Sequence, residues 1–236
     1  VTIGRNRGTF ALGYLGLDYL VTDDVLLGAL VQIDDFDNEA SGLGAGLAEG
    51  QGWMAGPYLT ARVAERLYVD ARVAYGRADN SVSPLGTFVT GFDTERLLIS
   101  GSAMGDVPLG GGFAIWPEVG VRYISEDVQD YVDPLGVAIS GATIDQGEVA
   151  FSPRLDYRQT FADGWSIAPF AELEGLLTFG SDAFSAVQDG LRGRLVLGID
   201  SSAPAGLRFG VRGFYDGIGE DELEALGASV TVSFGF

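Results

Sequence analysis

The sequence predicts an all-β fold, an antiparallel up-and-down transmembrane β-barrel of which eleven strands are visible in this chain. Two observations predict it. Apolar and polar residues alternate with a period of two through segments of about 10 to 14 residues, which is the pattern of barrel strands that cross a membrane. The connections between these segments are alternately short and long, as they are when turns gather at one end of a barrel and loops at the other.

The alternation is clearest in two consecutive segments, 148–161 and 165–179. The first places Arg154 and Arg158 on one face, opposite its apolar residues. The second does the same with Glu172 and Glu174. A helix with this spacing would wind its charges through its apolar face, so the pattern indicates strands. The predicted strands are 9–20, 25–36, 52–63, 67–78, 92–104, 112–124, 147–161, 165–179, 189–200, 206–216 and 225–236.

The lengths of the connections predict which end of the barrel faces the periplasm. Short links are expected at 21–24, 64–66, 105–111, 162–164 and 201–205. Long loops are expected at 37–51, 79–91, 125–146, 180–188 and 217–224. In outer-membrane barrels the short turns are periplasmic and the long loops are extracellular.

Charges are confined to one face of the predicted strands. The apolar face carries no charge in mid-strand and is expected to meet lipid, whereas ten of the fourteen arginines point into the lumen, where guanidinium groups can bridge carboxylates. The predicted lumen charge network is Arg62, Asp70, Arg72, Arg96, Glu118, Arg122, Arg154, Asp156, Arg158, Glu172, Glu174, Arg192, Arg194, Arg208 and Arg212, with Asp200 and Asp216 on the same face. The alternative is a soluble β-barrel or sandwich with the apolar face as its core, but the lack of Lys and the length of the strands count against it.

The composition excludes several classes of function. The 236 residues include 33 acidic and 14 basic residues, giving a net charge of −19, which disfavours binding to nucleic acid. The chain has no Cys and no His, and therefore no disulfide, no thiolate zinc site, no Ser-His-Asp triad and no histidine metal site. We expect neither a cofactor nor a metal centre, and we do not expect an enzyme.

Three local motifs have simpler explanations than a binding site. The glycine-rich run 42–46 lacks the Lys and the following helix of a phosphate loop, so an outer loop is expected. The acidic run 34–39 has calcium-like ligands, but Ala40 and Gly46 occupy the positions where an EF-hand needs Gly and Glu, which leaves weak divalent binding as the alternative. The acidic stretches 126–133 and 220–224 are expected to be extracellular loops that bridge to lipopolysaccharide phosphates through divalent cations.

Four segments resemble the autotransporter β-domain, the C-terminal translocator of type V secretion: 14–28, 52–58, 213–219 and the closing segment 230–236. The resemblance implies a bacterial outer-membrane barrel of twelve strands that begins with a helix threading the pore. It also implies an assembly signal of alternating apolar residues, Val232, Phe234 and Phe236, read by the barrel-assembly machinery. Thr231 stands where the commoner terminal pattern has Gly.

The direction of the first segment departs from this family pattern. Segment 9–20 runs toward the periplasm, whereas the first strand of a translocator runs outward. We therefore expect residues 1–236 to form one barrel domain whose first strand and pore helix lie upstream, with 1–8 as the first outer loop.

The leading hypothesis for function is a translocator and anchor for an N-terminal passenger, with outer-membrane lipid, the pore helix and the passenger as partners. The alternative is a porin-like passive channel for small solutes, since a twelve-strand lumen lies between filled and open barrels. A third hypothesis is a lumen hydrolase that uses Asp156, Glu172 and Glu174 to cleave the passenger; the simpler reading pairs these acids with Arg154, Arg158, Arg192 and Arg194.

Overall fold

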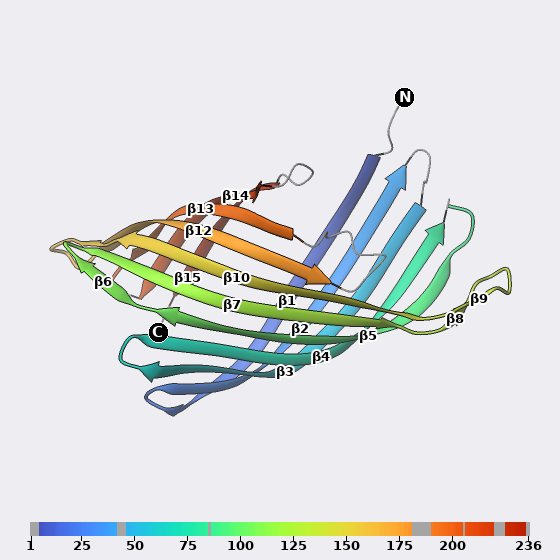
Figure 1. Cartoon of the computed structure of the whole chain (residues 1–236), viewed down its shortest axis with the longest axis horizontal. Coiled ribbons are helices and arrows are strands. Elements are labelled where there is room, and N and C mark those ends of the chain that lie inside the picture. Colours follow the sequence, from blue (N-terminus) through green and yellow to red (C-terminus); the bar gives the residue numbers. More distant parts are fainter. Residues whose placement is uncertain are drawn as a thin grey trace.

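The protein is described by a computed structural model that covers residues 5–41, 46–84, 86–180, 190–204, 206–219 and 225–234 (Figure 1). Its long strands are β1 (Arg5–Thr22), β2 (Val25–Ser41), β3 (Gly46–Ala64), β4 (Leu67–Pro84), β5 (Thr90–Gly105), β7 (Phe113–Val128), β10 (Ala142–Tyr157), β12 (Ser166–Gly180), β13 (Gly190–Ser202), β14 (Leu207–Ile218) and β15 (Ala225–Phe234). Each of the eleven predicted strands overlaps one of these. The predicted all-β, antiparallel fold is confirmed.

The long strands form one strongly curved sheet, with neighbours in the chain also neighbours in the sheet (Figure 1). Their order is β1-β2-β3-β4-β5-β7-β10-β12-β13-β14-β15, and every pairing is antiparallel. Strands β1 and β15 form the two edges, and over the described ranges they are not paired with each other. Among the same residues no helix is long and apolar enough to cross a membrane.

Within the described residues, four short strands lie in the connections between the long ones. Strand β6 (Val107–Gly110) pairs with β7, and β11 (Gln159–Thr160) pairs with β12. The hairpin of β8 (Tyr131–Val132) and β9 (Ala138–Ile139) lies within the long connection between β7 and β10. The link predicted at 105–111 is therefore itself largely a strand, and it turns back at Gly110, Gly111 and Gly112, which all have positive φ.

The strands extend further into the long-loop end than the sequence predicted. The loop expected at 37–51 is mostly strand, since β2 continues to Ser41 and β3 begins at Gly46. The loop expected at 79–91 shortens in the same way. The prediction followed rows of large apolar residues, whereas these extensions pair through their backbones and consist mostly of polar and small residues. Strands of 16 to 19 residues exceed the 9–11 needed to span a bilayer, so they project beyond it.

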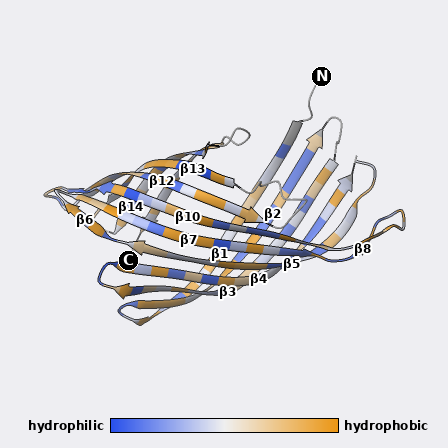
Figure 2. Ribbon diagram, viewed as in Figure 1, coloured by the Kyte–Doolittle hydropathy of each residue, from blue (hydrophilic) through white to orange (hydrophobic). Residues whose placement is uncertain are grey.

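The two faces of the sheet differ in polarity, as the alternating colours along each strand in Figure 2 show. The convex face exposes rows of large apolar side chains, with Leu15 76% and Leu17 83% exposed. Few apolar side chains are buried, and these are mostly small or lie on the concave face: Met54, Ala61, Ala74, Ala78, Ala168, Phe170 and Leu176. Exposure of this much apolar surface suits a hydrocarbon environment rather than water.

Close packing over a glycine joins the first three strands. Asp18, Gly28 and Tyr58 lie side by side in register on β1, β2 and β3. The Tyr58 ring crosses Gly28, and its hydroxyl donates a hydrogen bond to the Asp18 carboxylate at 2.8 Å. A Cβ atom at Gly28 would lie 2.3 Å from Cζ of Tyr58, so only glycine leaves room for the ring.

We expect Gly28→Ala to destabilise the folded protein by about 1–3 kcal/mol, because the ring must move and lose its bond to Asp18. The free energy of unfolding in lipid vesicles measures the change. Gly175→Ala is the control, since a Cβ there meets nothing within 4 Å. Removing the ring in Gly28→Ala/Tyr58→Ala should make the glycine substitution nearly neutral; an equal penalty with and without the ring would contradict this packing.

A charged cavity on the concave face

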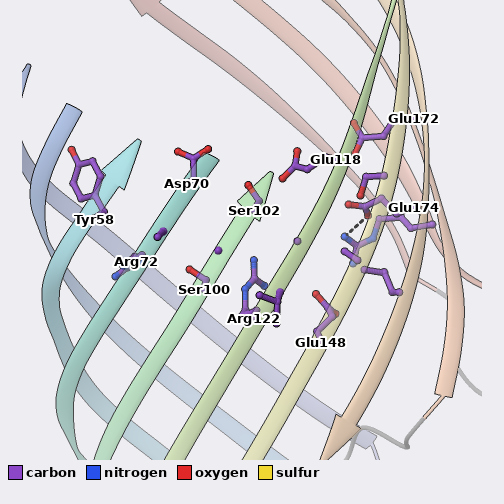
Figure 3. A pocket seen from close by; sticks show the side chains of 18 of the residues that line it. Tyr58, Asp70, Arg72, Ser100, Ser102, Glu118, Arg122, Glu148, Glu172 and Glu174 are labelled. Carbon is purple, nitrogen blue, oxygen red and sulfur yellow. Dashed lines mark hydrogen bonds and ion pairs between the residues drawn. The ribbon is translucent and has the colours of Figure 1, made fainter. Parts of the chain in front are cut away.

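Residues of β2 to β13, most of the polar ones at alternate positions along their strands, line a cavity of about 630 Å³ on the concave face (Figure 3). Period-two alternation brings them there, because positions two apart on a strand share a face. Acidic and basic side chains are mixed in the lining. Labelled in Figure 3 are Tyr58, Asp70, Arg72, Ser100, Ser102, Glu118, Arg122, Glu148, Glu172 and Glu174.

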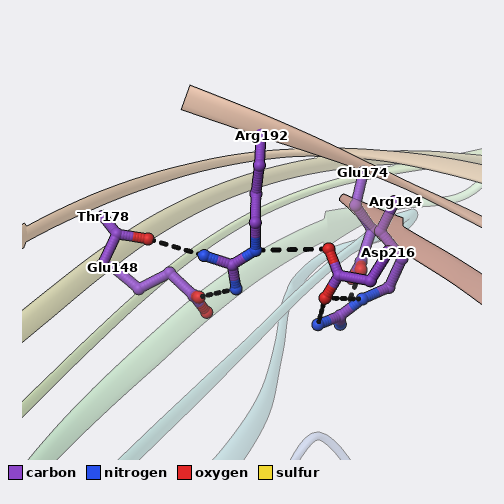
Figure 4. Close-up of polar contacts among 6 residues, drawn as sticks. All are labelled: Glu148, Glu174, Thr178, Arg192, Arg194 and Asp216. Atoms are coloured by element: carbon purple, nitrogen blue, oxygen red, sulfur yellow. Dashed lines mark hydrogen bonds and ion pairs between the residues drawn. The ribbon is translucent and has the colours of Figure 1, made fainter. Parts of the chain in front are cut away.

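At one side of the cavity two arginines of β13 share one carboxylate of β14 (Figure 4). Arg192 Nε donates to Asp216 Oδ1 at 3.2 Å, and Arg194 Nη2 donates to Asp216 Oδ2 at 2.6 Å. Arg192 also reaches across β12 to Glu148 at 3.1 Å, and Arg194 reaches Glu174 at 2.9 Å. Asp216 is almost fully buried, so this linked set ties β10, β12, β13 and β14 together.

A second cluster forms around Arg154 of β10. Its Nε donates to Asp156 at 2.7 Å, and its Nη2 spans β12 to reach Asp200 of β13, also at 2.7 Å. The guanidinium carbon lies 3.6 Å from the centroid of the Phe170 ring. The planar cation therefore stacks on an aromatic face while its edges bind carboxylates.

A third cluster joins strands that are not neighbours. Arg96 of β5 donates to Asp34 of β2 at 2.7 Å and to Glu126 of β7 at 3.2 Å. To reach Asp34 the side chain crosses β4 and β3, and it passes over Gly52, where a Cβ atom would lie 2.5 Å from Nη1. The contacts of Arg96 thereby span five strands, from β2 to β7.

Several charges in the cavity have no ion-pair partner among the described residues. Within the described ranges Glu118, Glu172 and Arg122 make no hydrogen bond or ion pair through their side chains, and Arg72 makes only a long 3.5 Å hydrogen bond to Gln32. Asp70 accepts a 2.5 Å hydrogen bond from Thr60. Charges left free in this way keep the space between them hydrated.

The remaining residues of the predicted lumen network lie elsewhere. Arg62 lies at the short-turn end and binds Asp24 of the β1–β2 turn, next to an irregularity in register between Arg62 and Ala64. Arg158, Arg208 and Arg212 line a second pocket near the short turns. Of the predicted assembly signal, Val232 and Phe234 are exposed, and Phe236 lies outside the described residues.

The sequence prediction missed several partners in these clusters. Asp34 and Glu126 fell at the end of a predicted strand and in a predicted loop, and Glu148 and Tyr58 were not singled out. Glu126 and Glu148 lie an even number of residues from Arg122 and Arg154 and therefore on the same charged face. Extending that alternation beyond the apolar rows would have found both. Of the local motifs, 42–45 and 220–224 lie outside the described residues. In the part of the chain that the structure covers, no group of three or more acidic side chains is placed to hold a metal ion.

An apolar convex face, a charged concave face and an antiparallel meander define an outer-membrane β-barrel protein. The sequence model of the autotransporter β-domain family matches residues 4–213, and the chain belongs to that family. The predicted location in the bacterial outer membrane is thereby confirmed. No curated protein sequence matches the chain significantly.

Solved autotransporter structures share the fold. The β-domain of the Bordetella autotransporter BrkA is similar with a TM-score of 0.70 at 16% identity, over 96% of this chain and 90% of that one. The translocator domain of NalP from Neisseria meningitidis has a TM-score of 0.69 at 18% identity, over 99% of this chain and 81% of that one. The transport unit of AIDA-I from Escherichia coli has a TM-score of 0.64 at 13% identity, over 99% of this chain and 84% of that one.

Proposed function

We propose that this chain is the translocator and membrane anchor for a passenger that precedes it in the same polypeptide. The observation that carries the proposal is the contrast between the faces of the sheet. The convex face is apolar, whereas the concave face surrounds a polar cavity with charges that have no ion-pair partner among the described residues. An extended polypeptide in transit has unpaired backbone groups, which a hydrated passage can solvate and a hydrocarbon core cannot. Membership of the family supports the same role.

We further propose that residues 1–236 form a single barrel domain that one more strand completes. Strands β1 and β15 both run toward the short-turn end, so direct pairing between them would be parallel. A strand running the other way would pair with both edges and give twelve strands, an even number as in other single-chain bacterial barrels. We place that strand, together with a pore helix, upstream of Val1.

The charged residues have a structural role in this proposal. Because each of Arg96, Arg154 and Arg192 bridges strands that are not adjacent, the ion pairs hold the curvature of the wall. We also propose that exposed Val232 and Phe234, with Phe236, form the signal that the assembly machinery reads. Lipopolysaccharide would contact the long-loop end of the barrel.

A surface-display experiment tests the translocator function. The chain is expressed in a Gram-negative bacterium with its native upstream segment and an epitope-tagged passenger. We expect antibody on intact cells to detect the epitope, and the membrane-embedded chain to migrate differently on gels before and after heating. The same passenger exported without the β-domain is the control and should stay hidden in the periplasm.

The proposal fails if the barrel assembles, as judged by the gel shift, and the epitope is never exposed. In that case a conductance measurement in planar bilayers distinguishes the alternative, because a passive channel would stay steadily open to small ions.

A further inference from the structure

A second pocket, of about 490 Å³, lies on the concave face close to the short turns. We call it the basic pocket. Three arginines line it, Arg158 after β10 and Arg208 and Arg212 on β14. Between them lie hydroxyl groups from β12, β13 and β15, of Ser166, Ser202, Thr231 and Ser233.

The three arginines differ from those of the three ion-pair clusters in making no ion pair with a carboxylate among the described residues, and they share this with Arg72 and Arg122 of the cavity. Arg96, Arg154, Arg192 and Arg194 each bind at least two acidic side chains. Arg158, Arg208 and Arg212 are exposed, and their side chains make no ion pair within the described ranges. The carboxylate that lines the pocket is Asp200, and Arg154 already holds it. In a chain with a net charge of −19, three unpaired guanidinium groups gathered in one place are unexpected.

The spacing of the arginines limits what can bind. Arg208 and Arg212 are four residues apart on one strand, which separates their Cα atoms by about 13 Å. To bind one phosphate or sulfate, all three side chains would have to converge over this distance and from two strands. Carboxylates at alternate positions of an extended polypeptide recur about every 7 Å and can meet each arginine in turn. The hydroxyls of Ser166 and Ser202 bond to each other at 2.7 Å. Those of Thr231 and Ser233 are suited to donate hydrogen bonds to the same carboxylates.

We propose that the basic pocket binds the carboxylates of an acidic, extended polypeptide segment inside the barrel near its periplasmic end. The inference deepens the proposed function, since it assigns a place on the wall for the chain in transit. Arginine forms two parallel hydrogen bonds with a carboxylate, which gives the contact both strength and direction. At physiological salt, charges beyond about 8 Å are largely screened, so the acidic loops at the far end do not repel the segment.

Peptide binding to the purified, refolded full chain in detergent tests the proposal. The probe is a fluorescein-labelled peptide of alternating Glu and Ser, compared with one of alternating Gln and Ser. We expect fluorescence anisotropy to detect binding of the Glu peptide alone at about 0.15 M salt. Arg208→Gln/Arg212→Gln should weaken binding about tenfold or more, and Arg158→Gln should weaken it further.

Arg7→Gln/Arg66→Gln is the matched control, because both of these arginines are exposed, make no ion pair among the described residues and lie outside the basic pocket. It removes the same charge and should leave binding within about twofold, as expected for screened charges. The heat-dependent gel shift of every variant checks that it has folded.

Unchanged affinity in the double variant would overturn the proposal. Displacement of the peptide by an equal concentration of inorganic phosphate would also overturn it, in favour of a small-oxyanion site. The surface-display assay separates this result from the function as a whole. If the barrel displays its passenger but does not bind the Glu peptide, only the proposal for the basic pocket fails. If the barrel binds the peptide but displays no passenger, only the translocator function fails.

Discussion

Leu173→Arg is expected to destabilise the protein in a bilayer by about 2–4 kcal/mol, the range for an arginine that faces lipid at the membrane midplane. Leu173 is the middle residue of β12, and 55% of it is exposed on the convex face. Trp165 and Phe179, at the two ends of the same row, are the aromatic residues expected at the membrane interfaces. The free energy of unfolding by denaturant in phospholipid vesicles, followed by tryptophan fluorescence, measures the effect.

Depth provides the control for this substitution. Ile167→Arg introduces the same side chain on the same row near the periplasmic end, where the expected cost is about 0–1 kcal/mol. Glu172→Gln, next to Leu173 on the opposite face, should change stability little, because this carboxylate has no ion-pair partner among the described residues. If Leu173→Arg and Ile167→Arg cost the same, the convex face of β12 does not span the membrane in the assigned position.

The fold could be predicted from the sequence because a strand with lipid on one face and a polar lumen on the other needs strictly alternating apolar and polar residues. Segment 165–179 keeps its acids on one face and its apolar residues on the other, and β12 lies where it was predicted to within one residue at each end. Alternation is a local property, so no knowledge of distant residues was needed. Where the strands leave the membrane the apolar signal stops, and the ends of β2 and β3 were therefore missed.

The partners within the site could not be predicted in the same way. The pairing of Arg96 with Asp34 crosses two intervening strands, and it depends on the curvature of the sheet and on the space above Gly52. Neither is visible in a period-two pattern. Arg62 was predicted to belong to the lumen network, but it binds a turn residue, Asp24, next to an irregular register at the end of β3. The alternation of residues along the strand does not reveal such an irregularity.

Asp216→Asn is expected to destabilise the protein by about 3 kcal/mol, the lower end of the range for breaking a buried ion pair on one side. The Asp216 side chain is 9% exposed and binds both Arg192 and Arg194. Its loss leaves two guanidinium groups close together without the carboxylate between them, so repulsion adds to the lost hydrogen bonds. Unfolding by denaturant in lipid vesicles again gives the change.

The exposed pair of Arg77 and Glu95 is the matched control for Asp216→Asn, because it joins neighbouring strands at 3.0 Å but lies in solvent. Glu95→Gln should cost no more than about 1 kcal/mol, as exposed pairs do. Further substitution of Arg194→Gln in the Asp216→Asn protein should recover part of the lost stability, since it removes one of the two stranded charges. An equal cost for Asp216→Asn and Glu95→Gln, with no recovery, would mean that the linked set around Asp216 is solvated like a surface pair and does not hold the wall.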